Sequence, residues 1–317
     1  MIRHSALRNK IFKYAREYLR FDDCRFTDPF VNEYLDGYRA WLDEGHHGEM
    51  DYLQKHLPFK ENPERLLPGV RSAIVVIKNY KNTTRRRLTG DLKISRYAVG
   101  QDYHAVMKER LEKLAGFIQN ENPGVRCYSG VDSRPLAERS LALKAGIGFR
   151  GKNTMVIKPG LGSYFFIGVV LTTHSFSSDE ILNWNCGQCR LCLDACPTGA
   201  LNEPYSLDAN RCISYMTIEQ KTALAENDLQ KTKGWLFGCD ICQEACPYNH
   251  EGTPLTDWKE FRPEAGVGFE FFRQVPGEAK IPQDTPIYRS RKRVVPNWKK
   301  AYVGHSVIAS GAPAPPP

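Results

Sequence analysis

Residues 186–201 read CGQCRLCLDACPTGAL and place four cysteines within eleven residues, with a proline directly after the last one. A shorter version of the motif, CDICQEACPYN, follows at residues 239–249. Eight of the ten cysteines lie between residues 186 and 246, and only Cys24 and Cys127 fall outside. Thiols at this density indicate a unit that is organised by metal more than by an apolar core.

The spacing of the cysteines indicates which metal. The first motif is C-x2-C-x2-C-x3-C-P, the bacterial ferredoxin run, whose first three cysteines bind one 4Fe–4S cluster while the fourth binds the other. The second motif is C-x2-C-x3-C-P, and Cys212 upstream is a substitute for the cysteine that it lacks. If the last cysteine of each motif binds the cluster of the other motif, two complete ligand sets result. They are Cys186, Cys189, Cys192 and Cys246 for one cluster, and Cys196, Cys212, Cys239 and Cys242 for the other.

Two other metal sites fit this spacing less well. Structural zinc sites pair two C-x2-C hairpins across a variable loop, and they do not need the third close cysteine and the trailing proline that occur twice here. The C-x3-C-x2-C spacing of a radical S-adenosylmethionine cluster is absent. Since cytosolic thiols stay reduced, such a group of cysteines is also more typical of metal than of disulfides.

The composition is that of an ordinary globular protein, with 317 residues, 41% of them hydrophobic and 25% charged. The opening MIRHSALRNKIFKYAREYLR has no apolar leader, and the longest apolar run, YFFIGVVL at residues 164–171, is too short to span a bilayer. We therefore expect a cytoplasmic protein with no membrane contact. The formal charge of +8 falls to about +4 with two clusters of about −2 each, a mild indication of an anionic partner.

Hydrophobic periodicity predicts an α+β chain with a mixed α/β domain at residues 1–180. We expect helices at residues 6–20, 102–120 and 136–147, strands at 72–80 and 125–129, and two strands joined by a Pro-Gly-x-Gly turn within 153–173. Residues 181–250 form the expected ferredoxin-like domain with two 4Fe–4S clusters. Residues 251–317 form a basic C-terminal extension that contains YRSRKRVVPNWKK and ends in a Pro-rich tail expected to be disordered.

Three further stretches, SRYAVGQDYH, VDSRPLAERSLALKAGIGFRGKNTMVI and RCISYMTIEQK, occur in order with the cysteine run within residues 47–250. Together they resemble one family, epoxyqueuosine reductase, the cobalamin-dependent iron–sulfur enzyme of queuosine biosynthesis. The resemblance implies reduction of the epoxide of epoxyqueuosine, at the wobble position of the anticodon of certain tRNAs, to queuosine. It also implies a cobalamin-binding core related to that of the reductive dehalogenases and an external low-potential electron donor.

The resemblance assigns roles to individual residues. The family's proton-donating aspartate falls on Asp132, although an aspartate in a turn is usually a turn former or helix N-cap. Opening an epoxide leaves an alkoxide, and a carboxylic acid can protonate it if burial or the corrin raises the pKa of that acid. The family's corrin contacts fall on Lys60, Ser95, Asp132, Val156, Lys158, Ile167, Cys239, Asp240, Ile241 and Cys242.

Several positions have a simpler interpretation or depart from the family. Lys60 stands where relatives carry an arginine, Arg134 stands where they often carry a small residue, and Val156 and Ile167 can be plain core residues. His104 lies in DYHAVM, which lacks the glycine of the D-x-H-x-x-G cobalamin signature. We therefore interpret His104 as a helix-face residue and not as a cobalt ligand.

Basic residues predict contacts with tRNA. Lys221 falls where family members contact tRNA, and the segment with Arg291, Lys292 and Arg293 interleaves positive charge with Tyr288 and Trp298, as phosphate contact and base stacking require. Charge runs such as this one and Arg85–Arg87 are also typical of plain solvated faces.

The leading interpretation is an oxidoreductase, a tRNA epoxyqueuosine reductase that acts as a monomer. A ferredoxin-type electron carrier is the alternative from another class, but it leaves the stretch at residues 131–157 unexplained. A reductive dehalogenase-like enzyme acting on a small molecule is a third possibility. Such enzymes commonly use a tyrosine as proton donor and carry export signals.

Overall fold

The computed structural model describes residues 2–82, 92–222, 224–250, 252–263, 281, 283–292, 294–297 and 299–300. Arg85–Arg87, Arg293, Trp298 and the Pro-rich tail lie outside the described residues. Within the described ranges, no helix is long and apolar enough to cross a membrane.

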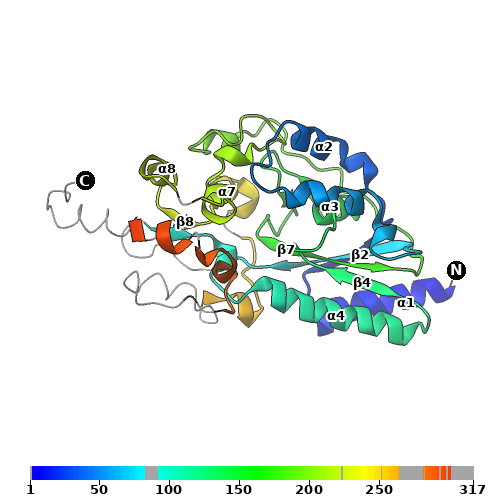
Figure 1. Ribbon diagram of the computed structural model, residues 1–317. Helices are drawn as coiled ribbons and strands as arrows, with labels where there is room; N and C mark the ends of the chain where they lie inside the picture. Colours follow the sequence, from blue (N-terminus) through cyan, green and yellow to red (C-terminus); the bar gives the residue numbers. More distant parts are fainter. Residues whose placement is uncertain are drawn as a thin grey trace, which may run out of the picture.

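A four-stranded antiparallel sheet forms the centre of the N-terminal part, in the order β1-β2-β7-β4 (Figure 1). Its strands are β1 (Asp23–Thr27), β2 (Ser72–Asn79), β4 (Cys127–Gly130) and β7 (Phe165–Thr172). The long central strands β2 and β7 pair from Ser72 opposite Thr172 to Asn79 opposite Phe165. Both are almost wholly buried, which explains why the two segments read as continuous apolar runs.

Helices cover both faces of this sheet (Figure 1). One face carries α1 (Ile2–Lys13), continued by the π-helical η1 (Tyr14–Tyr18), and α4 (Tyr103–Glu121). The other carries α2 (Asp36–Asp43) and α3 (Tyr52–Glu61), and α5 (Glu138–Lys144) contacts β2 and β7. Alternation along β2 divides the core, because Ile74 and Val76 pack with α4 whereas Val75 and Ile77 pack with α5.

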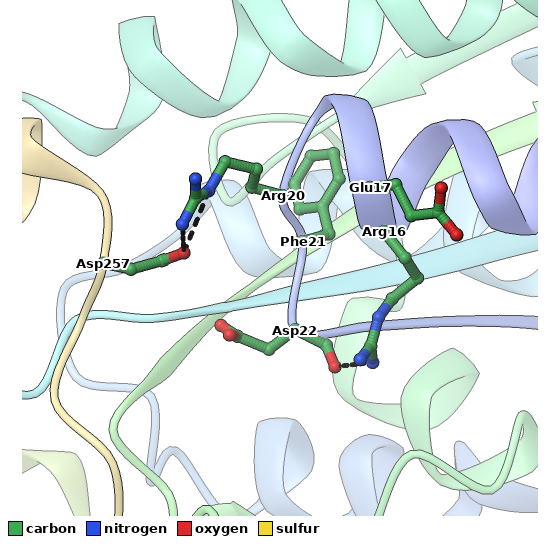
Figure 2. A pocket seen from close by; sticks show the side chains of 6 residues that line it. All are labelled: Arg16, Glu17, Arg20, Phe21, Asp22 and Asp257. Carbon is green, nitrogen blue, oxygen red and sulfur yellow. Dashed lines mark hydrogen bonds and ion pairs between the residues drawn. The ribbon is translucent and has the colours of Figure 1, made fainter.

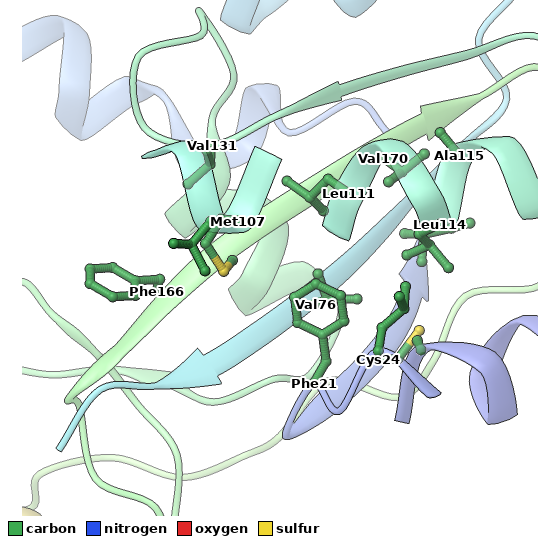
Figure 3. Close-up of a cluster of buried hydrophobic side chains, with 14 of the residues drawn as sticks. Phe21, Cys24, Val76, Met107, Leu111, Leu114, Ala115, Val131, Phe166 and Val170 are labelled. Atoms are coloured by element: carbon green, nitrogen blue, oxygen red, sulfur yellow. The ribbon is translucent and has the colours of Figure 1, made fainter. Parts of the chain in front are cut away.

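The larger core lies between α4 and the sheet. Figure 3 shows Met107, Leu111 and Leu114 of α4 beside Val76 and Val170 of the central strands. Gly168 of β7 permits this approach, because a Cβ there would lie 2.9 Å from Leu111 and 3.2 Å from Met107. Each buried side chain of this size contributes about 1.5–3 kcal/mol, so the apolar face of α4 fixes the position of its N-terminus.

Short elements make up the cysteine-rich part: α6 (Leu191–Asp194), η5 (Ala209–Arg211), α7 (Ile213–Ile218), α8 (Glu226–Lys231), β8 (Trp235–Phe237), α9 (Ile241–Glu244) and η6 (Pro247–Asn249). The two cysteine motifs carry α6 and α9, which contact each other. β8 pairs in parallel with β3 (Lys93–Ile94) of the N-terminal part. The two parts are therefore joined by backbone hydrogen bonds as well as by packing.

The chain after residue 250 returns to the N-terminal part. Trp258 and Phe261, before and within η7 (Lys259–Phe261), are buried in the larger core. Asp257 pairs with the fully buried ammonium of Lys78 on β2, and at 2.6 Å with Arg20. Figure 2 shows the Arg20–Asp257 pair in a polar crevice of about 240 Å³, and none of the residues that line it is a predicted site residue.

The remaining short elements are η2 (Asn32–Tyr34), η3 (Pro63–Arg65), η4 (Arg96–Ala98), β5 (Phe149–Arg150), β6 (Val156–Ile157) and η9 (Pro286–Ser290). The expected order of helices and strands is confirmed, with ends shifted by a few residues. The two strands expected on either side of the Pro-Gly-x-Gly turn are β6 and β7, and they belong to different sheets because β6 pairs with β5. The reason is that the apolar run of β7 can be buried on both faces only at the centre of the main sheet.

Candidate active site

Asp132 lies in the turn that follows β4, and its backbone adopts the left-handed conformation with φ of 50°. A non-glycine residue held in this region carries strain of about 1–3 kcal/mol, which the surrounding structure must offset. Val131 before it is buried, whereas the side chain of Asp132 is 61% exposed. The turn therefore presents a carboxylate at the end of the sheet where α4 begins.

The first residues of α4 hold this carboxylate. The hydroxyl of Tyr103 donates to Oδ2 of Asp132 at 2.7 Å, and Nε2 of His104 lies 2.9 Å from the same oxygen. Nδ1 of His104 lies 2.6 Å from Oδ1 of Asp102. Asp102 is also the N-cap of α4 and accepts from the His104 amide at 3.0 Å. Asp102, His104 and Asp132 form a continuous chain of hydrogen bonds, which we call the relay.

The hydrogen bonds set the protonation of the relay. Although the side chain is 61% exposed, partial desolvation by the surrounding residues acts to raise the pKa of Asp132; the hydrogen bonds from His104 and Tyr103 and the charge of Arg139 outweigh this effect and place the pKa below its ordinary value. Burial acts to lower the pKa of His104, but the hydrogen bonds with Asp102 and Asp132 outweigh it and raise the pKa. Both shifts favour a protonated imidazole between two carboxylates. Burial alone does not give Asp132 the raised pKa that a proton donor was expected to need, because both donors favour the charged carboxylate.

A second charged group lies near Asp132. Lys60 of α3 donates from Nζ to the carbonyl of Leu136 at 2.7 Å, and burial is the main cause that lowers its pKa. Burial raises the pKa of Glu138, at the start of α5, to about 8. Oε1 of Glu138 is buried and has no hydrogen-bond partner among the described residues. The charges of Lys60 and Asp132 act on Glu138, so the protonation states of the three groups are linked.

Two of the segments predicted to contact the corrin lie side by side. The Ser95 amide donates to the Phe237 carbonyl at 2.9 Å, and the Arg96 amide donates to Oδ2 of Asp240 at 2.9 Å. Gly238 is left-handed and lies against Oγ of Ser95, so a Cβ at this position would collide with it. Oγ of Ser95 is buried, with no hydrogen-bond partner in the described part of the chain. Ser95 and the Cys239–Cys242 stretch therefore occupy one site.

Tyrosines connect this site to the relay. The ring of Tyr97 contacts Phe237 of β8 and Tyr103 of α4, with centroids 5.9 and 6.0 Å away. Burial raises the pKa of Tyr97 well above its ordinary value, and the charges of Asp132 and Asp240 add to this effect. The charges of Asp132 and Asp240 therefore act on the same aromatic group.

The other residues predicted to contact the corrin, which are Val156, Ile167 and Lys158, lie in different surroundings. Val156 is buried in the smaller core and Ile167 packs against it, which agrees with the simpler interpretation of both as core residues. The ammonium of Lys158 pairs with Asp23 at 2.8 Å. A contact between Lys158 and a corrin would thus need the backbone of Lys158 or the loss of this ion pair.

The first predicted set of cysteines surrounds one cavity. Its lining contains Cys186, Cys189, Cys192 and Cys246, together with Lys152, Asn153, Ile157, Pro247 and Tyr248. Cys192 and Cys246 are buried, whereas Cys186 and Cys189 are partly exposed. Cys246 comes from the second motif, so the structure brings the crossed ligand together with the first three cysteines.

The second predicted set is also brought together. Burial, and after it the charges of Cys212, Asp240 and Cys196, raises the pKa of Cys239 to about 12. Burial and the neighbouring thiols of Cys239 and Cys212 raise the pKa of Cys242 well above its ordinary value. Thiols in such surroundings ionise only against a strong positive charge, which bound iron provides.

The predicted tRNA contacts lie on the surface. Lys221 is 61% exposed and lies 3.3 Å from Asp51. The guanidinium of Arg291 stacks 3.9 Å from the centre of the Tyr288 ring, and Lys292 is exposed. Arg293 lies outside the described residues.

The C-terminal segment also contacts the relay. The Asp102 amide donates to the Asp284 carbonyl at 2.7 Å. Nε of Arg289 lies 3.9 Å from Oδ2 of Asp102. The basic extension therefore reaches the outer end of the hydrogen-bond chain that ends at Asp132.

Comparisons with known proteins identify the family. Residues 60–133 match the family model described as epoxyqueuosine reductase QueG, DUF1730, and residues 185–249 match the 4Fe-4S double cluster binding domain. Epoxyqueuosine reductase of Escherichia coli (strain K12) is 38% identical over 266 residues, which cover 82% of this chain and 69% of that protein. The chain belongs to the epoxyqueuosine reductase family.

Solved structures of epoxyqueuosine reductases share the fold. One, in complex with a tRNA-Tyr epoxyqueuosine-modified stem loop, has a TM-score of 0.79 at 27% identity and covers 95% of this chain and 80% of that one. The Bacillus subtilis enzyme, described with an aspartate catalytic loop swung out of the active site, has a TM-score of 0.76 at 26% identity, over 95% of this chain and 84% of that one. The predicted family, the reductase class and the double-cluster domain are confirmed.

Sequence reasoning missed three features of this epoxyqueuosine reductase site. It interpreted His104 as a helix-face residue, whereas both ring nitrogens of His104 are engaged in the relay. It gave no role to Tyr103 or to the half-buried Glu138. The helix N-cap at Asp102 was the available signal, because an N-cap directs the first turn of the helix, and hence Tyr103 and His104, toward the site at the end of the helix.

Proposed function

We propose that this chain reduces the epoxide of epoxyqueuosine in tRNA to queuosine. The conversion takes up two electrons and two protons and releases the epoxide oxygen as water. The complex of a family member with an epoxyqueuosine-modified stem loop supports tRNA as the substrate class. The observation that carries the proposal is the relay at Asp132, a proton source at a site that also borders the cysteine-rich part.

Asp132 is the proton donor in this proposal. The turn that presents its carboxylate is exposed and strained, as a group that must meet a large substrate requires. The aspartate catalytic loop described for the Bacillus subtilis enzyme supports the same assignment. Tyr103, whose pKa burial raises well above its ordinary value, stays protonated and holds Oδ2 of Asp132 in place.

His104 stores the proton that Asp132 delivers. The raised pKa favours the protonated imidazole, from which a proton can pass to Oδ2 of Asp132 over the 2.9 Å contact. An alkoxide that forms beside Asp132 is far more basic than a carboxylate and takes this proton. Asp102 keeps the ring in position and stabilises its charge at 2.6 Å.

The residues around Ser95 fit a bound cobalamin. A polar cradle next to Asp132 is offered by three groups: Oγ of Ser95, which is buried and has no partner among the described residues, the left-handed Gly238 beside it, and the half-buried cation Lys60. The residues that would hold the corrin are Lys60, Ser95, Asp132, Val156, Lys158, Ile167, Cys239, Asp240, Ile241 and Cys242. Cobalamin, when bound, supplies a strongly reducing cobalt centre.

The two cysteine sets hold the 4Fe–4S clusters in this proposal. Cys186, Cys189, Cys192 and Cys246 line one cavity, and Cys196, Cys212, Cys239 and Cys242 influence one another's charges. The second set adjoins Asp240 and thereby the proposed corrin site. An external low-potential donor supplies the electrons.

Basic surface residues complete the proposal. Lys221, Arg291, Lys292 and Arg293 contact the tRNA backbone, with the Tyr288 ring available for stacking. The protein acts as a cytoplasmic monomer, built from a cobalamin- and substrate-binding domain at residues 1–180, a ferredoxin-like domain at 181–250 and a basic extension at 251–317.

A turnover experiment tests the proposal. The full chain with reconstituted clusters and added cobalamin is incubated with titanium(III) citrate and tRNA that carries epoxyqueuosine, and the nucleosides are quantified by mass spectrometry. We expect queuosine in stoichiometric excess over enzyme, and none when cobalamin is omitted. Iron-loaded protein that binds no cobalamin and yields no queuosine would instead support a ferredoxin-type carrier. Turnover of a halogenated phenol without turnover of tRNA would support the dehalogenase-like alternative.

A further inference from the structure

The turn between β5 and β6 carries Lys152 and Asn153, and both residues line the cavity that the first cysteine set surrounds. Two backbone hydrogen bonds close this turn. The Gly151 amide donates to the Met155 carbonyl at 2.8 Å, and the Thr154 amide donates to the Gly151 carbonyl at 2.9 Å. A turn closed in this way holds the two side chains at its tip in fixed positions beside the cavity.

The ammonium of Lys152 is bonded to the loop of the first cysteine motif. Its Nζ donates to the carbonyl of Gly187 at 2.7 Å and to the carbonyl of Cys189 at 2.9 Å. The backbone of Lys152 is held as well, because its carbonyl accepts from the Tyr205 amide at 3.0 Å. No carboxylate among the described residues pairs with this ammonium. Its positive charge therefore acts on the cysteine loop without a compensating negative charge.

Asn153 makes a corresponding contact with the second cysteine motif. It is buried, and its Nδ2 donates to the carbonyl of Cys242 at 3.3 Å, while its Oδ1 accepts from the Met155 amide at 3.2 Å. Cys242 belongs to the second cysteine set. Adjacent residues of one turn thus contact the backbones of both motifs. The residue that contacts the first motif carries a charge, and the residue that contacts the second does not.

A cation in this place changes the energy of cluster reduction. One added electron makes a 4Fe–4S cluster more negative by one unit, so a nearby positive charge stabilises the reduced form and raises the reduction potential. Lys152 is half-buried, and water screens its charge less than it screens a charge on the open surface. Arg190 of the first motif is a contrast, since its side chain is 58% exposed and lies 3.9 Å from Asp194. Solvent and this carboxylate both weaken the effect of Arg190.

From these contacts we propose that Lys152 raises the reduction potential of the cluster that the first cysteine set binds, relative to the cluster of the second set. The inference rests on the proposed function in one respect, the assignment of the two cysteine sets to 4Fe–4S clusters. The step moves one electron from an external donor to the cluster, so the donor is oxidised, the cluster is reduced and no covalent bond changes. Lys152 thereby favours the first cluster as the one that is reduced first when the potential of the solution is lowered.

A redox titration followed by electron paramagnetic resonance tests this inference. The iron-loaded full chain, without cobalamin, is brought anaerobically to a series of potentials with titanium(III) citrate. Cys186→Ser and Cys212→Ser each leave one cysteine set complete and so assign the two cluster signals. Lys152→Gln keeps a hydrogen-bond donor but no charge, and should lower the reduced-to-oxidised ratio of the first cluster about tenfold at a fixed potential, a shift of about 59 mV for one electron. Lys152→Met, a second neutral variant, should give the same shift, and Lys152→Arg should titrate like the wild type.

Control measurements separate the outcomes. Lys113→Gln removes a lysine of α4 that is 55% exposed and pairs with Glu109, and it should shift neither cluster. An unchanged potential of the first cluster in the neutral Lys152 variants would overturn the inference. An equal shift in Lys152→Arg would also overturn it, because the shape of the loop and not the charge would then be responsible. A shift of the first cluster in the neutral variants, in a protein whose wild type does not convert epoxyqueuosine, would support the inference and count against the proposed function alone.

Discussion

Nε2 of His104 lies 2.9 Å from Oδ2 of Asp132, although 28 residues separate the two in the chain. The contact depends on the packing of α4 against the sheet, which brings the first turn of the helix to the end of β4. One proton is shared between an exposed carboxylate and a largely enclosed imidazole. This arrangement determines how the site should respond to mutation and to pH.

Replacing Asp132 should remove turnover and leave the fold intact. Asn is the best replacement, because it tolerates the left-handed backbone that Asp132 adopts. We expect Asp132→Asn to lower the rate of queuosine formation by about 10²–10⁴-fold, the usual contribution of a proton donor. Retained cobalamin and iron would show that the loss is chemical, and Ser133→Ala serves as the neighbouring control. Full turnover by Asp132→Asn would exclude it as the donor.

The pH dependence should follow His104. Since its pKa is raised in the folded protein, the wild-type rate should fall as pH rises through that value, and His104→Gln should be slow with a flatter profile. The ion pairs of His104 contribute stability that is fully present below the unfolded pKa of about 6.5 and lost as pH rises through the folded pKa. Urea unfolding should therefore show a larger deficit for His104→Gln at pH 6 than at pH 9.

His56 provides the opposite control. Burial and the nearby Lys60 lower the pKa of His56, so protonation of this residue disfavours the fold. His56→Gln should stabilise the protein at low pH relative to the wild type, with the difference vanishing as pH rises past about 6.5. A deficit for His56→Gln at low pH would contradict the lowered pKa of His56.

Single cysteine variants should show which cysteines bind which cluster, including the exchange of Cys246 and Cys196 between the two motifs. Cys246→Ser should lose the same cluster as Cys186→Ser, although it belongs to the second motif, because both line one cavity. Cys212→Ser should lose the other cluster. Iron content should fall from about eight to about four per chain, and electron paramagnetic resonance should identify which cluster remains. Cys127→Ser, outside the motifs on β4, should keep both; pairing of Cys246 with Cys212 in this experiment would refute the assignment.

The buried ammonium of Lys78 predicts an unequal effect of two neighbouring variants. Asp257→Ala removes one of the two carboxylates that face Lys78 and should lower the free energy of unfolding by about 1–3 kcal/mol. Arg20→Ala removes only the more exposed partner of Asp257 and should change the free energy of unfolding by less than about 1 kcal/mol. Chemical denaturation measures both, and equal effects would show that burial of Lys78 is not what makes the pair important.

The sequence predicted those features that rest on local spacing. The apolar run of β2, the periodicity of α4 and the cysteine intervals each determine a structure within a few residues, so the elements and the two ligand sets could be anticipated. The relay could not, because whether His104 meets Asp132 depends on how a turn and a helix N-terminus pack together. The lowered pKa of Asp132 could not be anticipated for the same reason, since two hydrogen-bond donors from another element decide it.

The contacts of the Asp102 amide with Asp284 and of its carboxylate with Arg289 give the C-terminal extension an unexpected importance. A segment that resembles a dispensable appendage in composition forms part of the wall behind the reaction centre. A chain shortened before residue 283 would uncover the N-terminus of α4 and expose Asp102 to water. Trimming this protein for crystallisation or expression would thus remove a positive charge that helps to lower the pKa of Asp102.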